Sequence, residues 1–195
     1  MSKPFEFKEF IIHQDKTAMK VGTDGVLLGA WCSLEQYPDT ILDIGSGTGL
    51  IGLMLAQRSE AMTIDAVEVD ENAYEQTVGN FEQSDWGDRL FCFHASAQEF
   101  ASEIEEEYDL IISNPPFFSN DLLPADASRL KSRHTIMLNH DDILLGISNI
   151  LKYRGRFCVV IPRSTEEKFI NTAHNYGLNL VRKQYIIPKQ GKIAN

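Results

Sequence analysis

The feature that most constrains the fold is an apolar strand that runs into a glycine-rich loop and then into a helix. The strand covers residues 40–44, the loop Gly45–Gly49 reads Gly-Ser-Gly-Thr-Gly, and the helix covers residues 50–58. This unit begins the α/β folds that bind nucleotides, because glycines let the backbone pass close to a ligand. The spacing G-x-G-x-G differs from the dinucleotide pattern G-x-G-x-x-G. Asp43 strengthens the pattern, since a carboxylate at the strand end can orient the loop or hold an ammonium group.

A second strand is predicted at residues 63–67 and is followed by Glu68-Val69-Asp70. In nucleotide-binding units a ribose-binding acid stands about 20 residues after the glycine loop, which is where Glu68 lies. We therefore expect Glu68 to bind both ribose hydroxyls. Asp70 fits better as the N-cap of a helix over residues 71–81.

Two further strands end in polar residues. The third, at residues 90–94, is followed by Ala95-Ser96-Ala97, and the fourth, Tyr108–Ser113, is followed by Asn114. The carboxyl ends of parallel strands meet at one edge of the sheet, where ligands bind in open α/β folds. We expect four side chains to gather at that edge: Asp43, Glu68, Ser96 and Asn114.

The fourth strand runs directly into Asn114-Pro115-Pro116-Phe117. Proline lacks the donor of a sheet ladder, so the strand must end and leave Asn114 at a rigid, extended tip. The Asn114 side-chain oxygen and the Pro115 carbonyl could accept both N–H bonds of a planar amino group and free its lone pair for attack. Phe117 could stack on the ring that carries the amine. The same residues also fit a plain proline-rich turn with a buried phenylalanine.

The segment before the first strand contains Gly22, Thr23 and Asp24, followed by a buried helix at residues 26–31. Thr23 or Asp24 is a good N-cap. A glycine-flanked helix start offers its N–H groups to an anion such as a carboxylate, although an ordinary capped helix explains the segment equally well.

The rest of the chain gives weaker signals. Residues 4–19 predict a short strand pair, and residues 118–139 a long loop, which in a compact domain is often functional. A helix is expected at 141–151, a fifth strand at 155–161, a helix at 165–175 and a sixth strand at 178–187.

Composition bounds the class of protein. The 195 residues carry 43% hydrophobic residues and suit one globular domain. The net charge of −10 argues mildly against nucleic acid as a partner, but basic residues concentrate locally, which keeps a basic patch open. The two concentrations are Arg129, Lys131 and Arg133, and Arg182, Lys183, Lys189 and Lys192. Scattered cysteines, histidines without metal-ligand spacing and no membrane span or signal peptide predict a cytoplasmic protein without a metal.

Together these motifs resemble the class I S-adenosylmethionine-dependent methyltransferases that modify amino nitrogens. The residues that carry the resemblance are the glycine loop after Asp43, Glu68-Val-Asp, and Asn114-Pro-Pro-Phe. The segment Met19–Trp31 (Met-Lys-Val-Gly-Thr-Asp-Gly-Val-Leu-Leu-Gly-Ala-Trp) is more specific. It is similar to the segment before the glycine loop in the bacterial tRNA(Val) adenine-37 N(6)-methyltransferase family, and the resemblance covers essentially the whole chain.

The resemblance implies a Rossmann-like α/β fold with a mostly parallel sheet and an N-terminal strand or hairpin extension. We expect one methyltransferase domain over residues 1–195, with the extension at 1–21 and the core at 22–195. The family fold has seven strands, the last two in an antiparallel hairpin. The seventh strand is expected to be missing, because the sequence stops at Asn195. Either it is a piece of a longer chain or the sixth strand is left as an exposed edge.

The resemblance also implies site residues. Catalysis is expected from Asn114, Pro115, Pro116 and Phe117, and RNA contacts from the loop residues Arg129, Lys131 and Arg133. The expected S-adenosylmethionine-binding residues are Lys20, Gly22, Thr23, Asp24, Asp43, Gly45, Ser46, Gly47, Gly49, Glu68, Val69, Ser96 and Ala97. Two positions depart from the family pattern. Ser96 stands where relatives often have an acid for the cofactor adenine, and Phe117 stands where tyrosine is commoner.

The expected reaction is methyl transfer to the exocyclic amino group of adenine in tRNA, at adenine 37 of a valine tRNA, by a monomer. Two alternatives stay open. A methyltransferase of protein glutamine side chains would use the same Asn-Pro-Pro chemistry and would suit an acidic surface. A binding module without catalytic activity could keep the fold and still bind S-adenosylmethionine.

Overall fold

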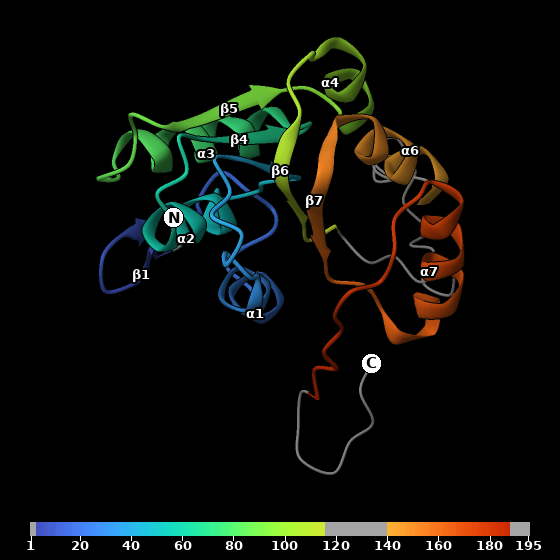
Figure 1. Cartoon of the computed structure of the whole chain (residues 1–195). Helices are drawn as coiled ribbons and strands as arrows, with labels where there is room; N and C mark the ends of the chain where they lie inside the picture. Colours follow the sequence, from blue (N-terminus) through green and yellow to red (C-terminus); the bar gives the residue numbers. More distant parts are fainter. Residues whose placement is uncertain (1–2, 116–139, 188–195) are drawn as a thin grey trace, which may run out of the picture. The chain divides into compact units, whose positions relative to one another are not determined.

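The structure, a computed structural model, describes residues 3–115 and 140–187 (Figure 1). The chain divides into two compact units. The sheet unit comprises the described residues 3–115 and 149–160, and the helical unit comprises the described residues 140–148 and 161–187.

The sheet unit is built on five parallel strands in the order β5-β4-β3-β6-β7. Their bounds are β3 Thr40–Ile44, β4 Thr63–Glu68, β5 Leu90–His94, β6 Tyr108–Ser113 and β7 Leu151–Val159. The strand order reverses beside β3, whose last residue, Ile44, pairs with Val67 on one side and Ser113 on the other. The expected mostly parallel, Rossmann-like sheet is therefore confirmed. In open α/β sheets, ligands bind where the strand order reverses in this way.

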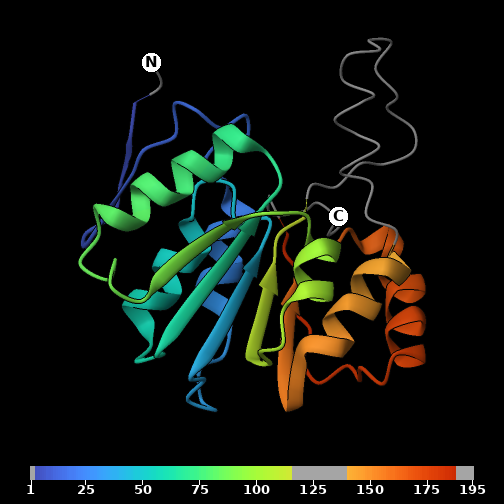
Figure 2. The same ribbon diagram turned by 90° about the horizontal axis from the view of Figure 1, so that it is seen from above.

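Four helices complete the sheet unit: α1 Thr23–Trp31, α2 Leu50–Arg58, α3 Glu71–Glu82 and α4 Ala97–Glu103. Figure 2 shows α4 on the opposite face of the sheet from α2 and α3. Right-handed crossovers require this, because the chain reverses direction across the sheet after β5. Asp70 caps α3 as expected, with its Oδ1 accepting from the Ala73 amide at 2.9 Å.

Helix α1 packs closely on α2 through glycine. A Cβ on Gly29 would lie 2.8 Å from the sulfur of Met54, so only glycine permits this approach without a shift. Arg58, at the end of α2, donates to the carbonyls of Gly29 and Cys32 at the carboxyl end of α1. The position of α1 against the sheet unit is therefore fixed at its carboxyl-terminal half.

The expected N-terminal strand pair is present as the antiparallel β1 Phe5–Glu6 and β2 Ile11–Ile12. Asn80 of α3 ties the end of this hairpin to the glycine loop. Its side chain bonds both the amide and the carbonyl of His13 at 2.9 Å and the carbonyl of Thr48 at 2.8 Å. The hairpin is thus anchored beside the edge of the sheet where the loop lies.

Three details of the prediction for the sheet unit are wrong. The N-cap of α1 is Gly22, and neither Thr23 nor Asp24 caps the helix with its side chain. The fifth sheet strand is β7 Leu151–Val159 rather than 155–161, because an irregular segment with Arg154 at φ 65° precedes its regular pairing with β6. Helix α4 was missed, although Ser96 and Glu99 form the capping box that signals a helix start.

The helical unit contains α6 His140–Ile150, which runs into the sheet unit at its last two residues, the 3₁₀ turn η1 Arg163–Thr165 and α7 Glu166–Asn175. The sixth strand expected at 178–187 is wrong, since the described residues there pair with no strand. Instead, Lys183 and Tyr185 bond Glu166 of α7. Alternation of apolar residues expresses only a preference for a sheet, and the hydrogen bonds of a ladder require a neighbouring strand.

Candidate active site

The three glycines of the loop share left-handed backbone angles for two different reasons. Gly45, Gly47 and Gly49 have φ of 75°, 59° and 76°. A Cβ on Gly49 would lie 2.7 Å from the Phe81 ring, so that glycine allows packing. A Cβ on Gly45 or Gly47 would meet no described atom within 4 Å, so these two face open space. The loop therefore presents bare backbone to a ligand at Gly45 and Gly47.

Glu68 organises this loop. Its side chain is buried, with Oε2 accepting from the Gly47 amide and Oε1 from the Asp70 amide, both at 2.9 Å. A carboxylate has about four acceptor positions, so each oxygen can still accept a further hydrogen bond. Glu68 thus combines a structural role with free acceptor capacity, as binding of two vicinal hydroxyls requires.

Asp43 is a buried acid whose side chain is only partly hydrogen-bonded. Its Oδ2 accepts from the Gly52 amide at 3.2 Å, but Oδ1 has no partner among the described residues. Burial raises its pKa to about 7, with the Gly52 bond opposing the rise and the charge of Glu68 adding to it. Buried polar atoms are nearly always hydrogen-bonded, so a donor from water or a ligand is expected at this oxygen. An ammonium group of a cofactor is a donor of the right kind.

Ser46 and Thr77 support the glycine loop through hydrogen bonds on its buried side. The Ser46 hydroxyl lies 3.2 Å from the Thr77 hydroxyl, which donates to the Gly47 carbonyl at 3.0 Å. Ser46 thus points into the protein, and its side chain shapes the loop. Thr77 and Asn80 were not among the predicted site residues. Both are buried polar residues of α3, and polar residues on the apolar face of a predicted amphipathic helix are the signal that could have identified them.

The first turn of α1 lies against the Asn114 side chain. A Cβ on Gly25 would be 3.6 Å from Asn114 Nδ2 and 3.3 Å from Leu50 at the start of α2. Lys20, Gly22, Thr23 and Asp24 are exposed just before this contact. No described side chain caps α1, so the N–H groups of its first turn stay available to an anion.

Asn114 and Pro115 lie half-buried beyond β6, and the Ser113 hydroxyl ties that strand end to the Ile44 carbonyl of β3 at 2.9 Å. Asn114, Asp43, Glu68 and the glycine loop therefore share one edge of the sheet, as expected. Pro116, Phe117, Arg129, Lys131 and Arg133 lie outside the described residues.

Ser96 and Ala97, after the end of β5, form the start of α4. Ser96 forms a capping box with Glu99, its hydroxyl lying 2.7 Å from Glu99 Oε2, and Ala97 begins α4. Hydrogen bonds from Ser96 lower the pKa of Glu99. The Ser96 hydroxyl is thus engaged within α4.

Beside it, the His94 ring lies 3.2 Å from the Val69 carbonyl and stacks on Tyr74 with ring centres 5.2 Å apart. This aromatic pair could not be predicted from the sequence, because Tyr74 and His94 are 20 residues apart and meet only in the fold.

A parallel sheet of this order, with an open glycine loop after β3 and a buried acid as the last residue of β4, defines a nucleotide-cofactor-binding enzyme of the Rossmann-like class. Residues 27–176 match the family described as "Methyltransferase small domain". A Christiangramia forsetii protein named "tRNA1(Val) (adenine(37)-N6)-methyltransferase" is 55% identical over 186 residues, which are 93% of this chain and 78% of that protein. A Bacteroides fragilis protein of the same name is 44% identical over 98% of this chain and 81% of its own length. The chain therefore belongs to the methyltransferase small domain family, within the group that carries this name.

Solved structures agree on the fold. An O-methyltransferase family protein from Burkholderia thailandensis superposes with a TM-score of 0.61 at 10% identity, over 82% of this chain and 51% of that one. TrmN from Thermus thermophilus has a TM-score of 0.51 at 22% identity, over 69% and 37%. Across residues 3–115 and 140–187, no helix has the length and apolar character needed to cross a membrane.

Proposed function

We propose that this chain transfers a methyl group from S-adenosylmethionine to the exocyclic amino group of adenine in tRNA, at position 37 of a valine tRNA. The observation that carries the proposal is the shared edge of the sheet. There the open glycine loop, the orphan oxygen of Asp43 and the buried Glu68 lie with Asn114, whose amide contacts the start of α1. The names of the relatives supply the substrate.

The residues present fit the cofactor. Glu68 would accept hydrogen bonds from its ribose hydroxyls, and Asp43 Oδ1 would accept from its ammonium group. Gly45, Ser46, Gly47 and Gly49 would line it with backbone, and the first turn of α1, with Gly22, Thr23 and Asp24 beside Lys20, would hold its carboxylate. Val69, Ser96 and Ala97 would border its adenine ring. When bound, S-adenosylmethionine supplies an electrophilic methyl group.

Asn114 and Pro115 would then act on the substrate. Their oxygens accept the two N–H bonds of the adenine amine, which places the nitrogen and stabilises the positive charge that develops as it attacks. Pro116 keeps the tip rigid and Phe117 stacks on the base. An anticodon-loop adenine is single-stranded, so moving it out of its stack costs only a few kcal/mol.

The remaining features of the proposal concern the whole protein. Arg129, Lys131 and Arg133 meet tRNA phosphates. The chain works as one methyltransferase domain over residues 1–195, as a monomer without a metal, in the cytoplasm where tRNA is modified. Methylation of protein glutamine and a role as a binding module are less favoured, because the relatives are named for a tRNA substrate.

The experiment that tests the proposal measures transfer of labelled methyl from S-adenosylmethionine. Purified protein is offered total tRNA and, separately, a protein extract, with Asn114→Ala as the control. Label in tRNA from the wild-type chain alone supports the proposal. Label in protein overturns the substrate, and binding of cofactor without any transfer overturns the activity.

A further inference from the structure

A cluster of one aromatic and two cationic side chains lies in the helical unit and contains none of the residues assigned to catalysis. The guanidinium carbon of Arg163 is 5.2 Å from the centre of the Tyr185 ring, and the Lys183 ammonium is 5.3 Å from it. Glu166, at the start of α7, fixes the cluster from one side. It bonds the Tyr185 hydroxyl at 3.1 Å and the Lys183 ammonium at 2.5 Å.

Arg163 is the member of this cluster best suited to bind an anion. Lys183 already has a carboxylate partner, whereas no described carboxylate lies within ion-pair distance of Arg163, which is exposed. An arginine stacked on an aromatic ring is already ordered, and its planar N–H edge matches the oxygens of a phosphate. Tyr185 therefore prepares Arg163 for binding without using its hydrogen-bond donors.

The cluster borders a hollow of about 370 Å³ lined by Arg163, Glu166, Glu167, Ile170, Asn171 and Tyr185. Glu167 is exposed and would repel a phosphate on the α7 side, whereas the charge of Glu166 is balanced by Lys183. An anion is therefore favoured at the Arg163 rim of the hollow.

The charge distribution along the sequence favours a polyanion at this unit. Residues 116–148 and 161–195, which comprise the helical unit and the undescribed residues that adjoin it in sequence, contain nine Lys and Arg and six Asp and Glu, a net +3. The remaining residues contain nine Lys and Arg and 22 Asp and Glu, a net −13.

Arg163 also follows the last residue of β7 by only four positions, and that residue is in register with Ser113, just before Asn114. The chain that carries Arg163 thus leaves the sheet at the edge where Asn114 lies.

We propose that Arg163, Lys183 and Tyr185 form a binding site for the phosphate backbone of the tRNA substrate. The inference rests on the proposed tRNA methylation and assigns RNA contacts to residues other than Arg129, Lys131 and Arg133. Arg163 bonds the phosphate, Lys183 balances the charge of Glu166 beside it, and Tyr185 holds Arg163 in place.

The test uses the full chain and a fluorescent transcript of unmodified valine tRNA, titrated at several salt concentrations. Arg163→Gln should weaken binding about three- to tenfold and lower the salt slope by about 0.7–0.9, the value of one phosphate contact. Tyr185→Ala removes no charge, yet it should weaken binding in the same range because Arg163 loses its support. The double variant should bind no worse than Arg163→Gln.

Two controls remove the same charge elsewhere. Lys168→Gln lies on α7 outside the cluster, and Arg154→Gln breaks another arginine–tyrosine pair, at 5.5 Å from the Tyr153 ring in the acidic sheet unit. Both should bind tRNA as the wild type does. Equal losses in Arg163→Gln and Lys168→Gln would reduce the effect to overall charge and overturn the site, as would a wild-type affinity in Arg163→Gln. A polyglutamate peptide that competes as well as tRNA overturns the assignment to RNA.

Methyl transfer measured on the same samples separates this inference from the proposed function. Wild-type protein that binds tRNA through Arg163 but methylates no tRNA overturns the function and leaves the site. Wild-type methylation of tRNA with an unchanged tRNA KM in Arg163→Gln overturns the site and leaves the function.

Discussion

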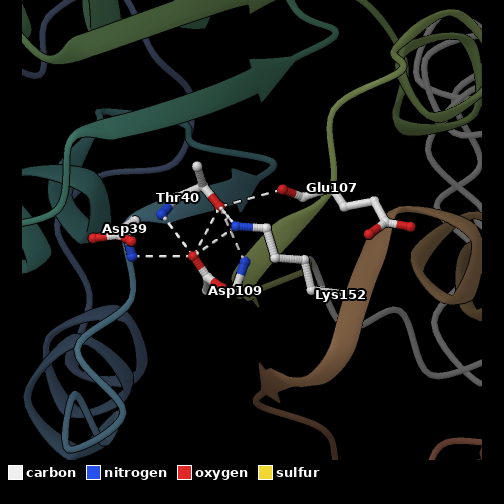
Figure 3. A network of polar contacts seen from close by, with 5 residues as sticks. All are labelled: Asp39, Thr40, Glu107, Asp109 and Lys152. Atoms are coloured by element: carbon white, nitrogen blue, oxygen red, sulfur yellow. Dashed lines mark hydrogen bonds and ion pairs between the residues drawn. The ribbon is translucent and has the colours of Figure 1, made fainter.

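Two aspartates at opposite edges of the same sheet show how differently a carboxylate can be used. Asp109 lies at the amino edge, at the start of β6, where one oxygen accepts four hydrogen bonds (Figure 3). The donors are the Asp39 amide at 3.0 Å, the Thr40 amide at 3.0 Å, the Thr40 hydroxyl at 3.1 Å and the Lys152 ammonium at 2.9 Å. Burial works to raise the pKa of Asp109, but the bonds from Lys152 and Thr40 outweigh it and the pKa is lowered.

Asp43, at the carboxyl edge, is fully buried and has one backbone bond and one oxygen without a described partner, so its pKa is raised to about 7. The donors at Asp109 come from the strand starts and hold the sheet together. At Asp43 the fold itself supplies no donor to a buried acceptor, which costs stability unless a ligand or a water supplies one. The amino edge of the sheet is therefore stabilised by its own hydrogen bonds, whereas the carboxyl edge holds the candidate binding site.

The variant expected to have the largest effect is Asn114→Ala, at the carboxyl edge of the sheet. The Asn114 acceptor bond strengthens as the amine gains charge, so its removal should cost on the order of 3 kcal/mol, about a hundredfold in single-turnover methyl transfer. Cofactor affinity and thermal stability should stay near the wild-type values. Near-normal transfer by this variant would leave the Asn-Pro-Pro stretch as the strand-ending turn that the sequence also allowed.

Glu68→Ala should have the next largest effect. The variant loses acceptors for the ribose hydroxyls and releases the Gly47 amide, and hydrogen bonds to a charged group contribute roughly 1.5–3 kcal/mol each. Calorimetry should therefore show S-adenosylmethionine binding weakened about tenfold or more. Glu75→Ala, which removes an exposed acid of α3 paired with Lys16, is the matched control and should bind normally. An unchanged affinity in Glu68→Ala would remove Glu68 from the cofactor site.

The elements at the carboxyl edge could be predicted from local sequence patterns, but their contacts could not. The apolar strand runs, the glycine loop and the acid at the end of β4 are local patterns, so they predicted β3, β4, β5 and β6 and the edge of the sheet that holds the candidate site. The orphan oxygen of Asp43 and the bond from the Gly47 amide to Glu68 depend on residues far apart in sequence. Nor do the identical loop glycines reveal that Gly49 packs on Phe81 while Gly45 and Gly47 face open space.

The amino edge was missed altogether. Asp109 and Lys152 are 43 residues apart, and nothing in either local sequence marks them as partners. The prediction of a strand at 178–187 was wrong for a related reason. A pattern of apolar residues does not show which strand, if any, will pair with it. Sequence motifs predicted the candidate residues for ligand contact, and the contacts that support these residues could be seen only in the fold.

Asp109→Asn tests the amino edge and should have a smaller effect, on stability alone. Partly exposed ion pairs contribute up to about 1 kcal/mol, so the free energy of unfolding should fall by about that amount while cofactor affinity is kept. The lowered pKa means that this stabilisation is present above the ordinary value of 3.8 and is lost as pH falls below it. Lys16→Gln, which breaks an ion pair of two more exposed side chains, should cost less. Denaturant unfolding at pH 7 and at pH 3 measures both, and an equal loss in the two variants would contradict a special role for the Asp109 network.

The smallest expected effect is a pH dependence that belongs to Asp43 alone. Because its pKa is raised, its contribution to stability has the opposite sign from that of Asp109. The protonated folded state is favoured at low pH, and this advantage is lost as pH rises from 3.8 towards 7. If ionised Asp43 binds the cofactor ammonium, the ionised fraction rises about threefold between pH 6.5 and pH 7.5, and cofactor affinity should rise by the same factor. Asp43→Asn keeps the shape but not the charge, so calorimetry across this range should give a lower affinity with a flatter profile. A profile as steep as that of the wild type would mean that another group titrates, and the orphan oxygen would then be filled by water rather than by the cofactor.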